Sequence, residues 1–252
     1  MNRSHKPSYF GDAYLDIYSR LMTDPEEVEM EADFVIDALG LNKNDLLLDL
    51  ACGFGKHMVF FRERGISTFG LDINLDYLLH ASRVENLSGK LVRGDMGVIP
   101  FSDNTFDAVA CLFNSFGYYS EDHPESYMDI LKENSRILKP GARFFLEVPN
   151  KRPVVNMVKH NQQTIQCGEE YMIHEFWDYE KETELLYNKT AFHINGESRT
   201  GQYTLRLFTK GQLKKILRKC GFEVENIYGD YDGSAWSLAG SPHMLFVARK
   251  RG

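Results

Sequence analysis

The stretch LLLDLACGFGKHMVFFRERGISTFGLD, from Leu46 to Asp72, predicts a strand, a glycine turn, a helix and a second strand in unbroken succession. Leu46, Leu47 and Leu48 form a continuous apolar run, which is typical of a parallel strand buried on both faces. The small residues of DLACGFG let the backbone turn sharply and approach a ligand closely, and the helical pattern that follows ends at Gly65. Units of this kind bind nucleotide-containing cofactors at the start of the helix.

Asp72 stands at the end of the second strand, which we expect to span Ile66 to Leu71. It follows Gly53 by 19 positions (72 minus 53), close to the spacing at which an acidic residue reaches ribose hydroxyls. A lone glycine turn would be weak support for a cofactor site, because many helices begin after small residues. The motifs elsewhere in the chain therefore decide the interpretation.

The turn resembles the first motif of the class I S-adenosylmethionine-dependent methyltransferases, in which an acidic residue precedes alternating small residues. In this sequence the motif consists of Asp49, Ala51, Gly53 and Gly55. Ala51 replaces the family's commonest first glycine, which moves the pattern away from the G-x-G-x-x-G of dehydrogenases. The resemblance is to the small-molecule type of this family and continues through GLD, RGD and FDAV, covering about residues 46–150 and 208–249. It implies S-adenosylmethionine as the cofactor, bound by these four residues and by Asp72.

Two later segments are also expected at the cofactor. After the short strand Leu91–Arg93, Asp95 can accept a hydrogen bond from the adenine amino group, while the apolar Ile73 and Met96 cover the ring faces. A plain turn is the alternative for Asp95, because Gly-Asp is common in turns. Asn114 follows the fourth strand, where open parallel sheets keep their ligand crevice, and it is the best polar candidate there.

The N-terminal segment carries aromatic residues before and within a predicted helix. Related methyltransferases fold such a segment over the bound cofactor, so the resemblance makes Tyr9 and Tyr14 candidates for cofactor contacts. A buried aromatic stripe that only packs the helix is the alternative.

Strand and helix alternate through five strands, which predicts a doubly wound, mostly parallel, Rossmann-like sheet. Three segments rich in β-formers then follow, Glu170–Tyr179, Glu184–Ile194 and Arg199–Phe208, and they predict a three-stranded antiparallel insertion. The chain ends as helix, strand, loop and strand, so we expect a seven-stranded α/β core whose last strand is antiparallel. The expected organisation is an N-terminal helical cap (1–45), a cofactor-binding core (46–150), a β lid (151–207) and the return to the core (208–252).

Composition narrows the class of protein. With 252 residues, 43% of them apolar and 26% charged, the chain is typical of one globular protein with a full core. No apolar run suits a membrane span or a signal peptide, so we expect a cytoplasmic protein. The four widely spaced cysteines indicate neither zinc nor disulfides, and the net charge of −7 disfavours nucleic acid. We expect a monomer or homodimer that acts on a small molecule.

The acceptor site is predicted in the insertion, because this segment leaves the core at the edge where such sheets bind ligands. Its candidate substrate contacts are Tyr118, His174, Trp177, Tyr203 and Arg206. A surface for dimer formation is the alternative. Catalytic candidates are His174, Asn114 and Tyr118, and the general base stays unassigned among the histidines, His57, His123, His174, His193 and His243.

No metal is expected, because adenine occupies Asp95 and Asn114 lacks an acidic companion, with Asp122 as a weak exception. The predicted activity is transfer of a methyl group to an O, N or C nucleophile of a small molecule. Two alternatives remain open. An NAD-dependent oxidoreductase could use Asp72 for its ribose, although Asp49 and the glycine pattern disfavour it. A noncatalytic protein that only binds S-adenosylmethionine could keep the same fold.

Overall fold

The computed structural model describes residues 8–21, 24–118, 126–158, 162–167 and 171–252. The described chain forms a seven-stranded sheet in the order β10-β11-β5-β4-β1-β2-β3 and a four-stranded sheet in the order β6-β7-β8-β9. The strands of the large sheet are β1 (Leu46–Leu50), β2 (Ser67–Asp72), β3 (Leu91–Arg93), β4 (Phe106–Cys111), β5 (Leu138–Pro149), β10 (Phe222–Tyr228) and β11 (His243–Lys250).

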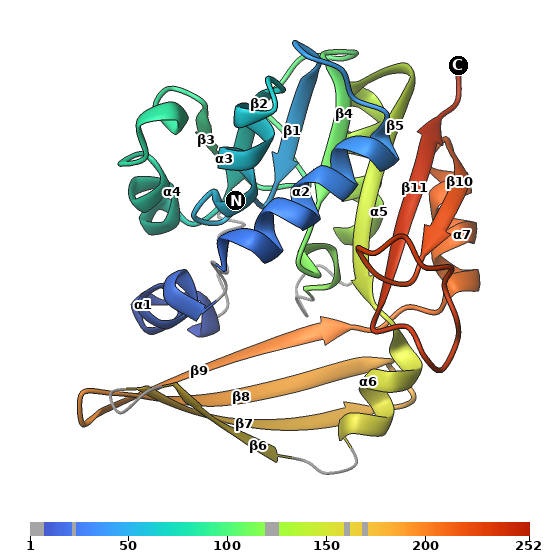
Figure 1. The fold of residues 1–252 in the computed structure, drawn as a ribbon. Helices are drawn as coiled ribbons and strands as arrows, with labels where there is room; N and C mark the ends of the chain where they lie inside the picture. Colours follow the sequence, from blue (N-terminus) through green and yellow to red (C-terminus); the bar gives the residue numbers. More distant parts are fainter. Residues whose placement is uncertain (1–7, 22–23, 119–125, 159–161, 168–170) are drawn as a thin grey trace.

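The large sheet confirms the predicted architecture. Strand β1 pairs in parallel with β2 and β4, and the parallel pairing extends to β3 on one side and β5 on the other. The last strand, β11, is antiparallel to both of its neighbours, β5 and β10. The carboxyl ends of the parallel strands therefore meet at one edge of the sheet, which is the lower edge in Figure 1.

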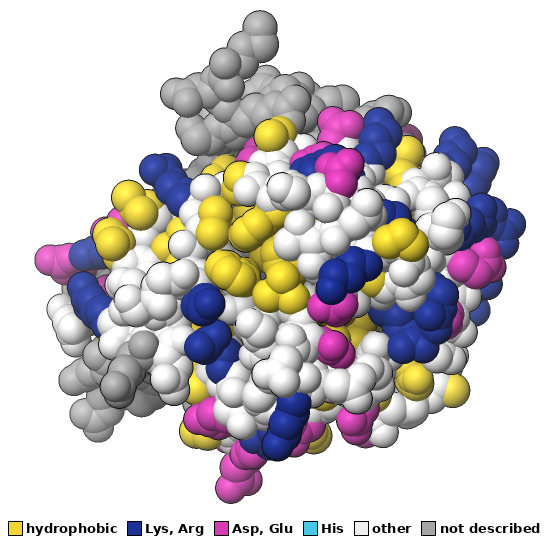
Figure 2. All heavy atoms as spheres, turned by 90° about the horizontal axis from the view of Figure 1, so that it is seen from above, with side chains coloured by type: hydrophobic (Ala, Val, Ile, Leu, Met, Phe, Trp, Pro, Cys, Tyr) yellow, Lys and Arg dark blue, Asp and Glu magenta, His cyan; other side chains and the backbone are white. Residues whose placement is uncertain are grey.

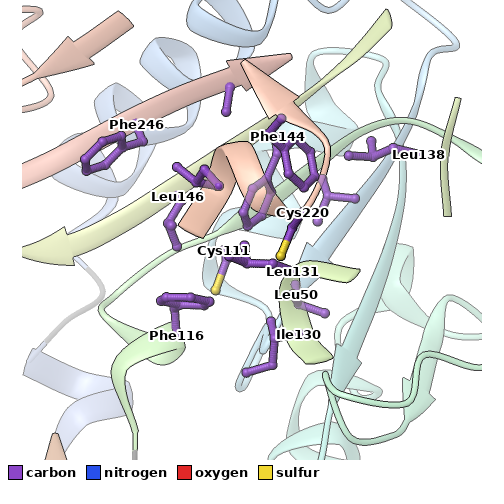
Figure 3. Packing of buried hydrophobic residues seen from close by; sticks show 14 of the residues in the cluster. Leu50, Cys111, Phe116, Ile130, Leu131, Leu138, Phe144, Leu146, Cys220 and Phe246 are labelled. Carbon is purple, nitrogen blue, oxygen red and sulfur yellow. The ribbon is translucent and has the colours of Figure 1, made fainter. Parts of the chain in front are cut away.

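Helices cover both faces of this sheet (Figure 1). On one face α2 (Pro25–Leu39) and α3 (Lys56–Glu63) pack against Leu47, and on the other α5 (Ser126–Ile137) and α7 (Lys210–Lys219) enclose Leu48. Consecutive leucines of β1 thus enter opposite cores, which explains its unbroken apolar run. Figure 3 shows the second of these cores, where Phe144 and Leu146 of β5 face Leu131 of α5.

Local sequence signals set the helix ends. The Asp24 side chain accepts a hydrogen bond from the Glu26 amide at 3.1 Å, Pro25 occupies the first turn, and Gly40 closes α2 with φ +65°. Helix α7 begins with a reciprocal cap between Thr209 and Gln212. The other helical elements are η1 (Ser8–Phe10), α1 (Asp12–Leu21), α4 (Leu75–Ala81), η2 (Glu85–Leu87) and η3 (Ser115–Gly117).

The segment 151–207 forms a helix, α6 (Lys151–Val158), and the smaller antiparallel sheet. This sheet lies across the carboxyl edge of the core, with α1 at the same edge (Figure 1). Its strands are β6 (Gln162–Cys167), β7 (Tyr171–Glu180), β8 (Leu185–Ile194) and β9 (Glu197–Arg206). The antiparallel insertion is confirmed, but the expected number of three strands was too low, because the polar strand β6 carries no alternating apolar pattern.

The described surface carries both signs of charge. Figure 2 shows basic and acidic side chains spread over the same face of the molecule, with a group of hydrophobic side chains near its middle. In the part of the chain that the structure describes, no helix is long and apolar enough to cross a membrane. Cys52, Cys111 and Cys220 are buried free thiols.

Candidate cofactor and acceptor site

The turn after β1 adopts a conformation that only small residues reach readily. Ala51, Gly53 and Gly55 have φ values of +61°, +56° and +80°. Among the described residues, a β-carbon on Gly53 would meet only Tyr77, at 4.0 Å, so this part of the chain leaves the space in front of Gly53 open. On Gly55 it would lie 2.8 Å from Leu87, so Gly55 allows the close packing behind the turn. The open side of the turn is therefore the one at Gly53.

Asp72 fixes this turn to the end of β2. One oxygen of its carboxylate accepts a hydrogen bond from the Gly53 amide at 2.8 Å, and the other accepts from the Asn74 amide at 2.7 Å. The Asn74 side chain in turn donates to the carbonyl of Phe10 at 3.1 Å. The carboxylate is thus held rigidly between the glycine turn and the N-terminal segment.

Asp49 is almost completely buried beside this turn, and its Oδ2 atom has no hydrogen-bond partner in the described part of the chain. The pKa of Asp49 is raised to about 7, mainly by burial and also by the negative charge of Asp72, while the positive charge of Lys56 opposes the rise. Two carboxylates and one unpaired acceptor at the turn favour a ligand that carries positive charge and hydrogen-bond donors.

The third strand end has the turn geometry that was the alternative for Asp95. Asp95 Oδ1 accepts a hydrogen bond from the Gly97 amide at 2.7 Å. Ile73 and Met96 are half-buried, and Met96 packs against the core. These three residues lie on the edge that also carries Asp72, but their contacts with adenine stay a prediction.

The end of β4 is strained. Phe113 and Asn114 are consecutive residues with left-handed backbones, at φ +52° and +59°, which is uncommon for residues with side chains. The Oδ1 atom of Asn114 is buried and has no hydrogen-bond partner among the described residues. An orphaned acceptor on a strained strand end is typical of a ligand contact.

A buried polar cluster that sequence reasoning missed supports this strand end. Glu147 of β5 accepts hydrogen bonds from the Phe113 amide at 2.6 Å and the Tyr231 hydroxyl at 2.7 Å, and pairs with His243 Nδ1 at 3.2 Å. Burial acts to raise the pKa of Glu147, but His243, Tyr231 and the Phe113 amide outweigh it and lower that pKa. The only sequence signal was a glutamate inside the apolar strand FFLEVP.

The histidines left open above have structural partners or lie outside the described residues. His57 Nε2 is 2.7 Å from Glu31 Oε2 in a buried pair, and His243 belongs to the Glu147 cluster. Lys56, next to His57, lies 3.6 Å from Glu31 and over the Phe113 ring at 3.3 Å. Neither Asp122 nor His123 is among the described residues.

The N-terminal aromatic residues lie between the core edge and the insertion. The Tyr14 ring stacks on Tyr18 at 4.3 Å and lies 6.0 Å from Tyr77. The ring of Tyr9 is 4.7 Å from that of Tyr203 on β9. Burial, followed by neighbouring tyrosines and Asp72, raises the pKa of Tyr14. Tyr9 is therefore buried and Tyr14 half-buried at the carboxyl edge of the core, and their contacts with the cofactor stay a prediction.

The predicted acceptor residues divide between the two faces of the small sheet. Tyr203 lies on the face toward the core and contacts Tyr118 at a ring distance of 5.5 Å, and Trp177 is buried on the same face. His174 does not lie there. It is on the outer face, where its ring contacts Thr164 at 2.8 Å and His193 at 5.1 Å. Side-chain alternation along β7 places it away from Trp177, so the structure argues against a role at the acceptor.

Arg206 also departs from its expected position. Its guanidinium lies over the rings of Tyr127 and Phe208, at 5.1 and 5.4 Å, and alternation along β9 directs it away from the face of Tyr203. It joins the insertion to α5 and the start of α7. Among the described residues there is no group of three or more His, Cys, Asp or Glu side chains that could hold a metal ion.

Comparison with known proteins agrees with this geometry. Residues 47–141 match the family model described as a methyltransferase domain. The putative methyltransferase YqeM of Bacillus subtilis is 24% identical over 81% of this chain and 83% of its own length.

Solved structures share the whole architecture. An S-adenosylmethionine-dependent methyltransferase from Clostridium acetobutylicum has a TM-score of 0.81 at 17% identity, covering 95% of this chain and 98% of the other. CalS10 of Micromonospora echinaspora, described as an amino pentose methyltransferase with bound S-adenosylmethionine, has a TM-score of 0.66 at 19% identity, covering 98% and 100%. The likeness extends over the insertion as well as the core.

Proposed function

We propose that this chain, which belongs to the class I S-adenosylmethionine-dependent methyltransferases, methylates a small molecule held between the carboxyl edge of its core and the insertion sheet. The observation that carries the proposal is the turn after β1, where Asp72 fixes Gly53 and the buried Asp49 keeps an unpaired oxygen. Such a site fits a cofactor that is cationic and carries ribose hydroxyls.

In this proposal the described residues bind and orient the cofactor. Asp72 would hold the ribose, Asp49 would face the charged methionine part, and Asp95 with Ile73 and Met96 would hold the adenine. Asn114 would complete the site from β4 through its unpaired oxygen. Ala51, Gly53 and Gly55 would supply the backbone floor, with Tyr9 and Tyr14 as the cover at the N-terminus.

S-adenosylmethionine supplies an electrophilic methyl group on a sulfonium, so the chain need not form a covalent intermediate. Alignment of the acceptor and exclusion of water are the main contributions of the protein, and alignment alone can supply about 7 to 11 kcal/mol. The insertion sheet and the N-terminal segment together close the carboxyl edge against solvent. Tyr118 and Tyr203 lie at this junction and are the acceptor contacts we retain, together with the buried Trp177.

Calorimetry tests the cofactor assignment directly. S-adenosylhomocysteine, the demethylated product, should bind the purified protein, while NAD should give no heat. Binding of NAD alone would instead support the oxidoreductase alternative. The noncatalytic alternative predicts binding of S-adenosylhomocysteine without any labelled product, when a small-metabolite extract is incubated with protein and methyl-labelled S-adenosylmethionine and analysed by mass spectrometry.

The remaining proposals concern the substrate class, the cellular location and the oligomeric state of the enzyme. The acidic net charge supports a small-molecule substrate rather than nucleic acid, and the buried free thiols accord with a cytoplasmic protein. The protein is proposed to act as a monomer or homodimer. The insertion serves as lid in this proposal, and its outer face, with His174 and His193, is the surface left for contact between two copies.

A further inference from the structure

The inner face of the insertion sheet, meaning the face toward the core, is apolar at both ends. At one end Ile173 and Phe192 pack against Tyr9 and Ile17 of the N-terminal segment. At the other end Trp177, Leu186 and Leu205 pack against Val158 of α6. Each end is therefore explained by packing, and any binding function belongs to the middle of this face.

Polar residues occupy that middle. Glu175, Asn188 and Thr190 are only 6%, 1% and 2% exposed, and we call them the polar strip. Glu175 lies opposite Thr190 in the strand register, and Asn188 lies opposite both Trp177 and Tyr203. Because neighbours on one face of a sheet are within reach of one another, the three side chains form one group.

The described part of the chain satisfies the hydrogen-bonding groups of the polar strip only in part. Thr190 Oγ1 donates to Asn188 Oδ1 at 2.7 Å, but Asn188 Nδ2 has no partner in the described part of the chain. Buried amide donors are almost always paired, because leaving one unpaired costs free energy. An unpaired donor 1% exposed therefore indicates a ligand that brings an acceptor oxygen.

Glu175 lacks a cationic partner among the described residues. It accepts a hydrogen bond from Gln163 Nε2 at 2.7 Å. Burial raises its pKa, although hydrogen bonds from Gln163 and Tyr9 oppose the rise. The rings of Tyr9 and Tyr203 lie 4.7 Å apart on this side of the sheet. A carboxylate beside aromatic rings is an environment that attracts ammonium groups.

We propose that the polar strip recognises the methyl acceptor as a small polar amine, whose ammonium group binds Glu175 while a hydroxyl or carbonyl oxygen accepts a hydrogen bond from Asn188 Nδ2. This inference rests on the proposed methyltransferase function and names the substrate class of the same site. The strip connects to the core through Tyr203, whose ring lies 5.5 Å from that of Tyr118 beyond the end of β4.

The test uses the full chain, labelled S-adenosylmethionine and a defined panel of amino alcohols, amino acids and amino sugars, each paired with the analogue in which hydroxyl replaces the amine. The wild type should methylate members of the amine set and none of the analogues. For the best amine, Glu175→Gln should reduce kcat/KM about 10- to 100-fold, the range for losing a hydrogen bond to a charged group, mainly through KM. Affinity for S-adenosylhomocysteine should stay within about twofold, because the strip lies outside the proposed cofactor contacts.

Asp178→Asn is the matched control, because it removes an exposed carboxylate from the opposite face of the same strand and should leave all constants unchanged. Asn188→Leu should raise KM while retaining the amine preference. Equal labelling of amines and analogues, labelling of no amine by a protein that binds S-adenosylhomocysteine, or wild-type KM in Glu175→Gln would each overturn the proposal. Failure to bind S-adenosylhomocysteine would instead refute the cofactor assignment itself.

Discussion

Asp49 is the residue whose charge should make cofactor binding depend on pH. Its pKa in the free protein is raised to about 7 by burial, so the carboxyl group is half protonated near neutrality. The ammonium group that S-adenosylmethionine and S-adenosylhomocysteine both carry favours the carboxylate and lowers this pKa in the complex, so affinity is full well above pH 7 and declines as the pH falls through it. Between pH 8 and pH 6 the affinity for S-adenosylhomocysteine should drop about tenfold, the linkage expected for one proton.

Calorimetry at both pH values measures this change. In Asp49→Asn the affinity should be lower and nearly independent of pH, because the variant cannot titrate at this position. The raised pKa of Asp49 also leads to a prediction for the cofactor-free protein. Its free energy of unfolding should fall as the pH rises from about 4 to 7. In this range the folded state still holds a proton that the unfolded chain has released. A steep pH dependence retained in Asp49→Asn would assign the titration to another group.

Gly53 offers a second prediction at the scale of one residue. Valine at this position would have to adopt φ +56° and would project into the space left open for the ligand. Gly53→Val should therefore abolish detectable binding of S-adenosylhomocysteine. Gly196→Val is the matched control, because Gly196 has φ +83° and a β-carbon there would have no described atom within 4 Å.

Both variants place valine on a left-handed backbone, which is strained for a residue with a side chain. They should therefore lose comparable stability in thermal unfolding. Only Gly53→Val should lose the cofactor. Unchanged affinity in a folded Gly53→Val protein would show that the turn does not face the ligand.

At the scale of elements, the Glu147 cluster joins β4, β5, β11 and the loop before β11. The hydroxyl of Tyr231 donates to the buried carboxylate at 2.7 Å, so Tyr231→Phe removes a hydrogen bond to a charged group. We expect the free energy of unfolding to fall by about 1.5 to 3 kcal/mol in urea denaturation. Tyr228→Phe is a suitable comparison, because this half-buried tyrosine packs on Phe34 and should change the stability by less than about 0.5 kcal/mol.

Both variants keep the aromatic ring and remove only a hydroxyl. The difference in stability between them therefore measures the hydrogen bond from Tyr231 to Glu147. Equal stability of Tyr231→Phe and the wild type would mean that water or another donor replaces the hydroxyl. An equal loss in both variants would mean that the hydrogen bond to Glu147 is not its cause.

Elements with strong local signals were predictable from the sequence, and those defined by partners were not. The apolar run that begins at Leu46 depends on short-range physics, and it forms β1 as expected. Strand β6 is polar and is ordered by pairing with β7. Its own sequence does not predict this pairing. Helix α4 ends at Ala81, and the short helical turn η2 follows it.

The candidate site shows the same division. Asp49, Asp72 and the small residues of the turn occur in one short motif, so their grouping could be inferred. Glu147, Tyr231 and His243 are up to 96 positions apart (243 minus 147). The register of β5 with β11 brings Glu147 to His243, and the loop before β11 adds Tyr231. The orientation of His174 depended on which face of β7 meets the core, and a sheet with aromatic residues on both faces does not settle that.

At the scale of the whole molecule, the insertion can be separated from the core at one place. The two ends of the insertion contact the same residue, Glu184, in the turn between β7 and β8: Lys151 Nζ contacts Glu184 Oε1 at 2.5 Å, and the Leu207 amide donates to the Glu184 carbonyl at 2.9 Å. A short Gly-Ser linker could therefore join Asn150 to Leu207 without distorting β5 or α7. Figure 1 shows the two connections at the same corner of the core.

Removal of residues 151–206 in this way should abolish methyl transfer but leave the affinity for S-adenosylhomocysteine within about tenfold. Asp49, Gly53, Asp72 and Asp95 all stay in the core, and only the aromatic cover that packs through Tyr9 on the insertion is released. Loss of this aromatic cover is the reason why we expect some decrease in the affinity for S-adenosylhomocysteine. Calorimetry and a labelled-methyl assay on the folded variant measure the two quantities separately. Turnover at the wild-type rate would place the acceptor site in the core and remove the insertion from the mechanism.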